Sequence, residues 1–263
     1  MGLTAARAAL QGDDSCTGRA LCRRYSDTVD AWLAELLEAA EADHGAGDVA
    51  LVAVGGYGRA ELSLQSDIDL LLLHDGRADI GVLADRVWYP IWDEGLKLGH
   101  SVRTIGEALA LAADDLDTAT SLLQVRHVAG DEDLTDELAG RARQQWQRRS
   151  KRWLGELSRR VAARHADAGE VAYLLEPDLK DGQGGLRDVH ALRWAEAARH
   201  LLWDGDDAAL AQAYETLLTV RVELHRRTGR PGDRLLLQEQ DAVAEALGLE
   251  SADALMRDVA AAA

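Results

Sequence analysis

The chain has 263 residues, 47% of them hydrophobic and 29% charged, which is enough to bury a core in one large domain or two small ones. Its formal net charge of −17 disfavours nucleic acid as the main partner, because phosphate backbones are bound by clustered Lys and Arg. No stretch approaches the roughly 18–20 apolar residues that span a bilayer. Met1–Gly12 lacks a secretory signal, and Cys16 and Cys22 suit a helix better than a disulfide framework. We therefore expect a cytoplasmic protein that makes no membrane contact.

The N-terminal part predicts a helix followed by a small mixed sheet. Within Ala5–His44, apolar residues recur at helical spacing, and Gly45–Asp48 breaks the pattern. The next segments predict, in order, a buried strand, one helical turn, a second strand, a helix and a third strand: Val49–Val54, Tyr57–Leu62, Ser66–His74, Ile80–Trp92 and Leu98–Ile105.

The rest of the chain predicts helices almost throughout. The expected helices are Gly106–Ala113, Leu116–Val128, Leu134–His165, Leu186–Leu202, Ala208–Thr228, Gln238–Leu247 and Ala252 onward. A short strand is expected at Tyr173–Leu175, and the chain stops inside a helical pattern, as expected of a fragment. The fold class is thus α+β: an N-terminal helical segment (1–48), a small mixed-sheet domain (49–130) and an all-helical domain (131–263).

A glycine-rich turn and two aspartates carry the chemical signal. Gly55, Gly56 and Gly58 follow the first strand, where backbone N–H groups without a nearby Cβ can approach phosphate. Asp67 and Asp69 lie two apart on a strand, so both carboxylates face one side and can share a divalent metal. Either motif alone is often a turn or a solvated strand edge, but together and in this order they indicate a metal–nucleotide site.

Two polar neighbours complete the predicted nucleotide contacts, Arg59 and Ser66. Arg59 has two interpretations, since its guanidinium can pair either with phosphate or with Glu61 or Asp67 to hold the loop. His100, on the third strand, is the histidine nearest to this site, and we expect it to be structural.

These motifs resemble a known family. The segments GGYGRAE and SDIDLLLL are similar to the DNA polymerase β-type nucleotidyltransferase superfamily, and more narrowly to the N-terminal part of the bacterial PII uridylyltransferase/uridylyl-removing enzymes. The resemblance extends from about residue 25 to the end of the chain. It includes Trp92–Leu96, Gly99–Thr104, Asp117–Leu123, Ala129–Asp131, Glu176–Asp188 and Arg221–Leu237.

The resemblance implies an activity. Family members transfer UMP from UTP to a tyrosine of the PII nitrogen-signalling protein with Mg²⁺ or Mn²⁺ and release pyrophosphate, and some relatives use ATP. It makes residues 49–130 the nucleotidyltransferase domain, with Asp67 and Asp69 as catalytic metal ligands and Gly55 and Gly56 at the nucleotide.

Two departures from the family are visible. The superfamily usually has a third carboxylate on a neighbouring strand, but Leu98–Ile105 has none, and the nearest candidates are Asp93 and Glu94. The chain also lacks the HD phosphohydrolase and ACT domains of the full-length enzymes. We therefore expect neither nucleotide removal nor glutamine control from it.

A second glycine-rich loop, Lys180–Asp188, is the other predicted site. Lys180 and Arg187 are expected to contact the nucleotide from the helical domain. The alternative is a tight loop in which Asp188 caps a helix and Arg187 forms a structural ion pair. Three other functions stay open at this point: an adenylyltransferase with another acceptor, a catalytically silent domain of the same fold, and a helical scaffold.

Overall fold

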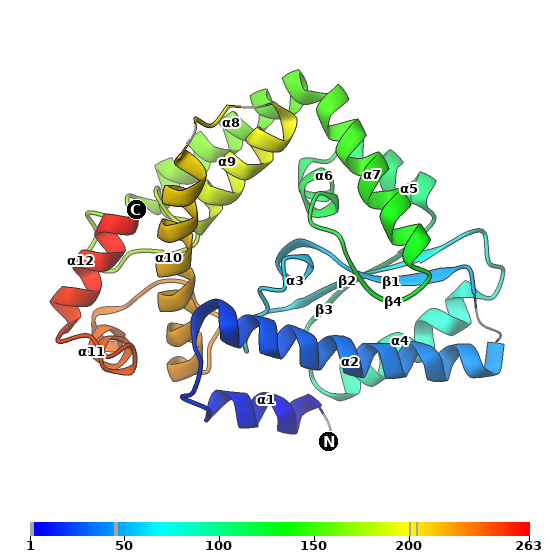
Figure 1. Ribbon diagram of the computed structural model, residues 1–263, viewed down its shortest axis with the longest axis horizontal. Helices are drawn as coiled ribbons and strands as arrows, with labels where there is room; N and C mark the ends of the chain where they lie inside the picture. Colours follow the sequence, from blue (N-terminus) through cyan, green and yellow to red (C-terminus); the bar gives the residue numbers. More distant parts are fainter. Residues whose placement is uncertain (1–2, 45–46, 200, 204) are drawn as a thin grey trace. The chain divides into compact units, whose positions relative to one another are not determined.

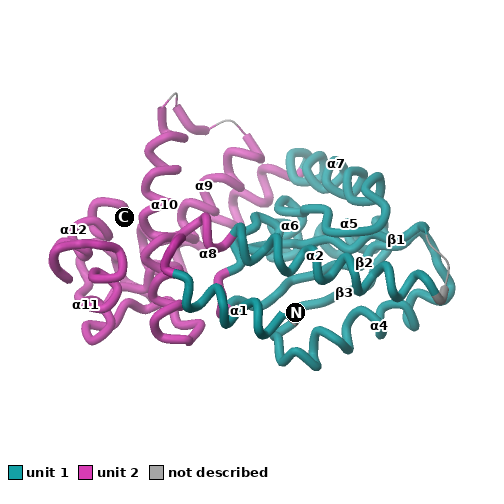
Figure 2. The backbone as a smooth tube through the Cα atoms, turned by 60° about the horizontal axis from the view of Figure 1, so that its bottom comes forward, with its two compact units in different colours: residues 1–13, 23–62, 66–148 teal, residues 14–22, 63–65, 149–263 magenta. Residues whose placement is uncertain are grey.

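The computed structural model describes residues 3–44, 47–199, 201–203 and 205–263. The chain divides into two compact units, coloured separately in Figure 2. Unit 1 comprises residues 1–13, 23–62 and 66–148, and unit 2 comprises residues 14–22, 63–65 and 149–263. The predicted α+β class is confirmed, because a mixed sheet and many helices are present. The expected boundaries after residues 48 and 130 stay predictions.

Unit 1 contains a four-stranded sheet in the order β3-β2-β1-β4 (Figure 1). The strands are β1 (Val49–Ala53), β2 (Ile68–His74), β3 (Leu98–Arg103) and β4 (Arg126–Gly130). β1 pairs antiparallel with β2 and β4, whereas β2 and β3 are parallel. The parallel pair requires a crossover helix. All five residues of the apolar β1 are buried, as expected for a central strand.

Helices cover both faces of this sheet. The crossover helix α4 (Ile80–Asp93) packs against β3 on one side, and α5 (Ile105–Ala112) and α7 (Glu132–Arg148) lie on the other (Figure 1). The short α3 (Gly55–Gly58) and α6 (Leu116–Leu122) contact each other beside the sheet. β3 ends at Arg103 because Thr104 begins a capping box with Glu107 that starts α5. This arrangement leaves the glycine-rich turn and the edge strand β3 close to α6.

The single helix expected over Ala5–His44 is wrong. The structure has α1 (Leu3–Gln11) and α2 (Gly18–His44) instead. Between them lie a glycine and short polar residues, whose side chains compete for backbone hydrogen bonds and favour turns. The predicted apolar stripe on α2 is confirmed, because Val29, Leu33 and Leu37 are buried. Gly45 and Ala46, in the expected break after this helix, lie outside the described residues.

The helix expected over Leu116–Val128 is also wrong in its second half. α6 ends at Leu122, and the chain then forms β4, which adds to the open edge of β1. The residues of β4 do not alternate between apolar and polar, so no period-2 signal marks them. Pairing with β1 therefore overrides a weak local preference.

Unit 2 is built from α8 (Ser150–Ala168), α9 (Leu186–Ala198), α10 (Asp206–Thr228), α11 (Leu237–Ala246) and α12 (Ala252–Ala262). The expected continuous helix Leu134–His165 is broken at Arg149, whose backbone angles (φ −103°, ψ 16°) leave the helical region. The expected strand Tyr173–Leu175 is a turn with Tyr173 and Leu175 exposed.

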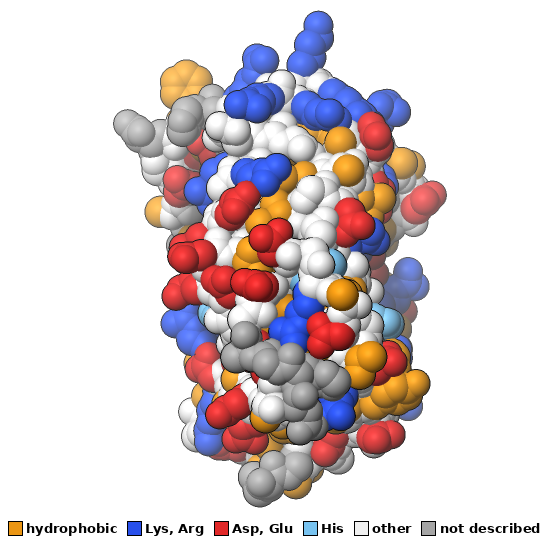
Figure 3. Space-filling model, turned by 90° about the vertical axis from the view of Figure 1, so that its right-hand side faces the viewer, with side chains coloured by type: hydrophobic (Ala, Val, Ile, Leu, Met, Phe, Trp, Pro, Cys, Tyr) orange, Lys and Arg blue, Asp and Glu red, His pale blue; other side chains and the backbone are white. Residues whose placement is uncertain are grey.

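The surface drawn in Figure 3 gathers Lys and Arg side chains at one end, while Asp and Glu are spread over its middle. The acidic excess of the chain is thus not evenly distributed on this face. Over the part of the chain that the structure describes, no helix is both long and apolar enough to span a membrane.

Candidate functional site

The glycine-rich turn is a tight structure between β1 and α3. Gly55 has a φ of +59°, a left-handed conformation that favours glycine. A Cβ on Gly58 would lie 1.6 Å from the carbonyl oxygen of Gln124, so only glycine fits there. The N–H of Val54 donates to the carbonyl of Asp69 over 3.1 Å, which fixes the turn to β2. Steric and backbone constraints therefore place Gly55 beside the aspartate strand.

Arg59 pairs with Glu61, one of the two interpretations open from the sequence. Its Nε lies 2.6 Å from Glu61 Oε2, and only 4% of the Glu61 side chain is exposed. A Cβ on Gly56 would lie 3.7 Å from Arg59 Nη2, so the guanidinium lies next to the glycine-rich turn. Arg59 thus has a clear role in holding the loop, and its contact with phosphate stays a prediction.

A second set of contacts holds the other side of the turn. The Tyr57 hydroxyl donates to the carboxylate of Asp30, which also accepts from Arg126 Nη2 over 3.1 Å. The Arg126 guanidinium lies 5.1 Å from the Tyr57 ring centroid, a cation–π distance. Burial, and then the neighbouring Asp30 charge, raise the pKa of Tyr57 far above its usual value. Tyr57 is therefore a neutral buried donor that ties α3 to α2 and β4.

Asp69 is the aspartate that faces the site. It lies half-buried on β2, and a Cβ on Gly55 would lie 3.8 Å from its Oδ2. In the parallel register it stands opposite Gly99 of β3. A Cβ on Gly99 would lie 2.3 Å from Asp69 Oδ1, so glycine there leaves the space that the carboxylate occupies.

Asp67 and Ser66 precede the first residue of β2. The Asp67 side chain is 58% exposed, and its Oδ1 lies 4.0 Å from Lys97 Nζ. An exposed pair at this distance is a weak interaction that a bound cation can displace. Ser66 is half-buried beside it.

Glu94, one of the two candidates for a third carboxylate, is held by the N-terminal helix, and a metal-binding role for it or for Asp93 stays a prediction. The Glu94 side chain accepts hydrogen bonds from the N–H and hydroxyl of Thr4, at 2.8 and 2.6 Å, and these bonds lower its pKa. Among the described residues, no group of three or more His, Cys, Asp or Glu side chains is placed to hold a metal. Mg²⁺ is commonly held by one or two carboxylates together with substrate phosphates. That Asp67 and Asp69 form such a pair stays a prediction.

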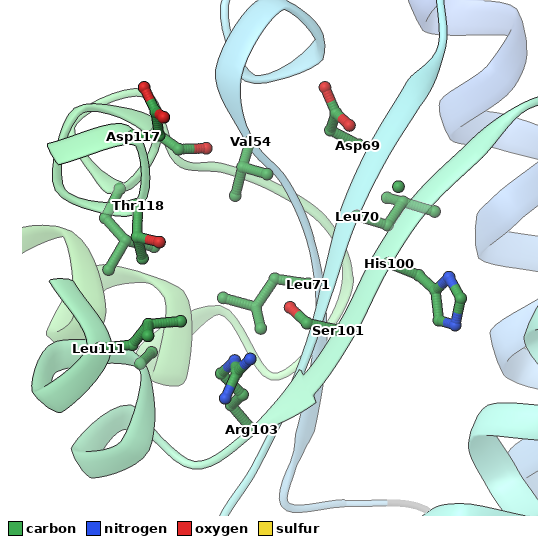
Figure 4. Close-up of a pocket in the computed structure, with 14 residues that line it drawn as sticks. Val54, Asp69, Leu70, Leu71, His100, Ser101, Arg103, Leu111, Asp117 and Thr118 are labelled. Carbon is green, nitrogen blue, oxygen red and sulfur yellow. The ribbon is translucent and has the colours of Figure 1, made fainter. Parts of the chain in front are cut away.

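A pocket of about 370 Å³ opens beside Asp69 (Figure 4). Its lining includes residues that the sequence analysis did not assign to the site: Gly99, Ser101, Arg103, Asp117, Thr118 and Ser121, with Leu71, Leu111 and Leu122 as apolar walls. The signal for the first three was present, because alternate residues of a strand share one face. The contributions of α6 depend on tertiary structure.

His100 packs as a structural residue. Its ring centroid lies 5.4 Å from those of both Trp88 and Trp92. In Figure 4 its side chain points away from Ser101, as alternation along β3 requires.

The second glycine-rich loop, in unit 2, is held by its own ion pairs. Arg187 Nη1 lies 2.7 Å from Asp181 Oδ1, and Lys180 Nζ lies 3.5 Å from Asp233 Oδ2. Asp188 accepts from the N–H of Gly184 over 2.7 Å. The Arg187 ion pair matches one part of the structural alternative for this loop, whereas Asp188 lies in the first turn of α9 and the N-cap is Gly185. Nucleotide contacts from Lys180 and Arg187 stay a prediction.

Asp233 belongs to a buried polar cluster in unit 2. Both ring nitrogens of His225 form hydrogen bonds: Nε2 lies 2.9 Å from Asp233 Oδ1, and Nδ1 lies 2.7 Å from the Ser63 hydroxyl. Arg221 Nε lies 2.7 Å from the same Asp233 oxygen. Burial lowers the pKa of His225 below its ordinary 6.5. Burial alone would raise the pKa of Asp233, but the His225 bond and the charges of Arg221 and Lys180 outweigh it and lower that pKa.

Comparisons with known proteins agree on one family. Residues 143–263 match the family model of GlnD PII-uridylyltransferase. Over 260 residues, 98% of the chain, the sequence is 48% identical to the bifunctional uridylyltransferase/uridylyl-removing enzyme of Streptomyces coelicolor. The resemblance to the PII uridylyltransferase family is confirmed.

Other relatives of the same name extend this result. The uridylyltransferase/uridylyl-removing enzymes of Mycobacterium tuberculosis and Pseudomonas fluorescens are 46% and 39% identical over 87% and 79% of the chain. The chain spans 31%, 29% and 25% of the lengths of these three relatives. The family model covers mainly unit 2, whereas the similarity to the Streptomyces uridylyltransferase takes in nearly all of unit 1 as well.

Proposed function

We propose that unit 1 is a metal-dependent nucleotidyltransferase that moves UMP from UTP onto a tyrosine of a PII-type signal protein, releasing pyrophosphate. The observation that carries the proposal is the placement of the Asp69 carboxylate, next to the Gly55 turn and at the edge of a pocket. The names of the relatives support uridylyl transfer. A cytoplasmic location follows from the same proposal.

The residues present suit the chemistry of this reaction. Asp67 and Asp69 would hold Mg²⁺ or Mn²⁺ together with the phosphates. When bound, the ion would neutralise charge on the phosphate oxygens. The turn at Gly55 and Gly56 would orient the triphosphate. The acceptor hydroxyl then forms a bond to the α-phosphorus, the bond to the β-phosphate oxygen breaks, and the phenol proton passes to solvent.

A catalytically silent nucleotide-binding domain is the second candidate. It is favoured by one observation, that the described residues contain no three-carboxylate cluster. Triphosphate turnover separates the two candidates, because a silent domain would bind nucleotide without transferring it.

Intact mass measurement tests the proposal. The chain would be incubated with a PII-type protein, Mg²⁺ or Mn²⁺ and UTP or ATP, alongside Asp67→Asn and Asp69→Asn. Asp136→Asn is a matched control, since this side chain lies exposed on α7. A gain of one UMP on the acceptor, lost in both site variants and kept in the control, is expected. Binding without transfer would favour the silent domain, and an AMP gain would favour the adenylyltransferase.

A further inference from the structure

Arg103 stands out among the arginines of unit 1. Arg59, Arg77 and Arg126 each pair with a carboxylate. Arg103 lines the pocket, and over the described residues it forms no hydrogen bond or ion pair. Glu107, four residues further on, does not pair with it, because its carboxylate is held by the Thr104 backbone and hydroxyl. A half-buried guanidinium with no carboxylate partner is available to a ligand.

The position of Arg103 relative to Asp69 follows from strand register. Asp69 stands opposite Gly99, and Leu73 stands opposite Arg103. Four residues along a strand span about 13 Å, and side chains at even spacing face the same side. Figure 4 shows Asp69 and Arg103 toward different ends of the pocket, with Leu71 and Ser101 between them. The pocket is therefore polar at both ends and partly apolar in its middle.

We propose that the Arg103 end of this pocket receives the nucleobase, and that Arg103 selects uracil over adenine by donating to a base carbonyl oxygen. This inference rests on the proposed function, which puts the phosphates at Asp69 and Gly55. The base of a nucleotide lies on the other side of its sugar from the phosphates. The apolar walls of Leu71 and Leu111 suit a planar ring.

The donor chemistry of arginine gives the selectivity. Arginine has five N–H donors and no acceptor. Uracil offers two carbonyl oxygens as acceptors. Adenine has no carbonyl oxygen, and its N1 and N7 acceptors each lie next to the exocyclic amino donor, which faces a guanidinium donor unfavourably. A site built to hydrogen-bond one group discriminates against an analogue that lacks it, because its polar atoms are then left unpaired. Arg103 therefore provides a physical reason for UTP rather than ATP.

Binding measurements on the full 263-residue chain test this. UTP, ATP, UMP and pyrophosphate would be titrated in the presence of Mg²⁺ into the unaltered chain, Arg103→Gln and Arg143→Gln. Arg143 is a matched control, since it lies exposed on α7. We expect Arg103→Gln to weaken the binding of UTP and UMP about tenfold or more, which corresponds to the loss of one hydrogen bond from a charged group. ATP and pyrophosphate should change little, so that the preference for UTP collapses.

A second variant keeps the test independent of the folding of the first. Leu111→Trp fills the middle of the pocket from a side chain that is 42% exposed. This variant should weaken the binding of UMP and leave the binding of pyrophosphate unchanged. A loss in Arg103→Gln that is equal for UTP and ATP and absent for UMP would make Arg103 a phosphate contact and overturn the proposal. If Arg103→Gln kept the preference for UTP over ATP and triphosphate binding still depended on Asp69, the role of Arg103 would be overturned and the proposed function would stand. If the unaltered chain bound no triphosphate, both proposals would be overturned.

Discussion

Replacing Gly99 by alanine tests whether the space beside Asp69 matters for transfer. The new Cβ would lie 2.3 Å from Asp69 Oδ1 and 3.4 Å from its Cγ. Ordinary contact begins near 3.4 Å, so the carboxylate oxygen must move by about 1 Å. A misplacement of about 1 Å in a catalytic arrangement can cost roughly 100-fold in rate. We therefore expect about a 100-fold loss of kcat/KM for UMP transfer without any change in charge.

Stability should change far less than activity. The atom that the new methyl group meets is the end of a rotatable side chain, and alanine costs less backbone entropy in a strand than glycine does. We expect the free energy of unfolding to stay within about 1 kcal/mol of the original. Transfer would be followed by intact mass and stability by urea unfolding. Gly81→Ala on α4 is the control, because a Cβ there meets no atom within 4 Å.

One result would refute this reasoning. If Gly99→Ala transferred UMP at the original rate while Asp69→Asn did not, the position of the Asp69 carboxylate would be uncritical. The alanine side chain would then be accommodated by movement of β3 instead.

Two further predictions concern the frame of the site, and a third concerns the buried polar cluster of unit 2. Gly58→Ala should destabilise unit 1 by about 3 kcal/mol or more, because its Cβ would meet the Gln124 backbone, and urea unfolding would measure this. Tyr57→Phe should cost about 1–3 kcal/mol by the same measurement, since it leaves the buried Asp30 carboxylate short of a donor. Thermal unfolding temperature should fall as pH drops below about 6.5, because the pKa of His225 is lower in the folded state and the unfolded chain binds the extra proton.

Each of these has a contradicting outcome. A stable Gly58→Ala protein would mean that the turn shifts away from Gln124 at little cost. Unchanged stability in Tyr57→Phe would mean that Arg126 alone is sufficient to stabilise the Asp30 carboxylate. The pH effect should shrink in His225→Gln, and an equal pH dependence in that variant would assign it to other groups.

The local parts of this site could be predicted from the sequence. β1 to β3, the turn at Gly55, and Asp69 on β2 with Asp67 just before it are marked by apolar runs, glycines and period-2 alternation, all of which are short-range signals. The pairing of Arg59 with Glu61 was one of two interpretations of that arginine, and the structure contains this pair. Nothing local marked β4, because its strand conformation comes from pairing with β1.

The pocket depended on information that the sequence does not carry locally. That Gly99 stands opposite Asp69 follows from the register of two parallel strands joined by α4, and one residue of slip would change it. Arg103 was inside a predicted strand, but its availability to a ligand emerges only when the carboxylates around it are placed. The break at Arg149 has no local mark, because charged helix-forming residues continue across it. The break before Gly18 is marked by Gly12 and the short polar residues after it, a turn signal that the helix prediction passed over.

The Asp69 end of this site is defined largely by main-chain geometry: the Val54 N–H on the Asp69 carbonyl, the Gly58 contact with Gln124, and the space left by Gly99. The far end of the pocket is defined by exchangeable side chains on β3, α5 and α6. Selection can therefore act on the two ends separately. Descendants of such a protein could acquire a different nucleotide preference through a few substitutions while inheriting the same transfer geometry.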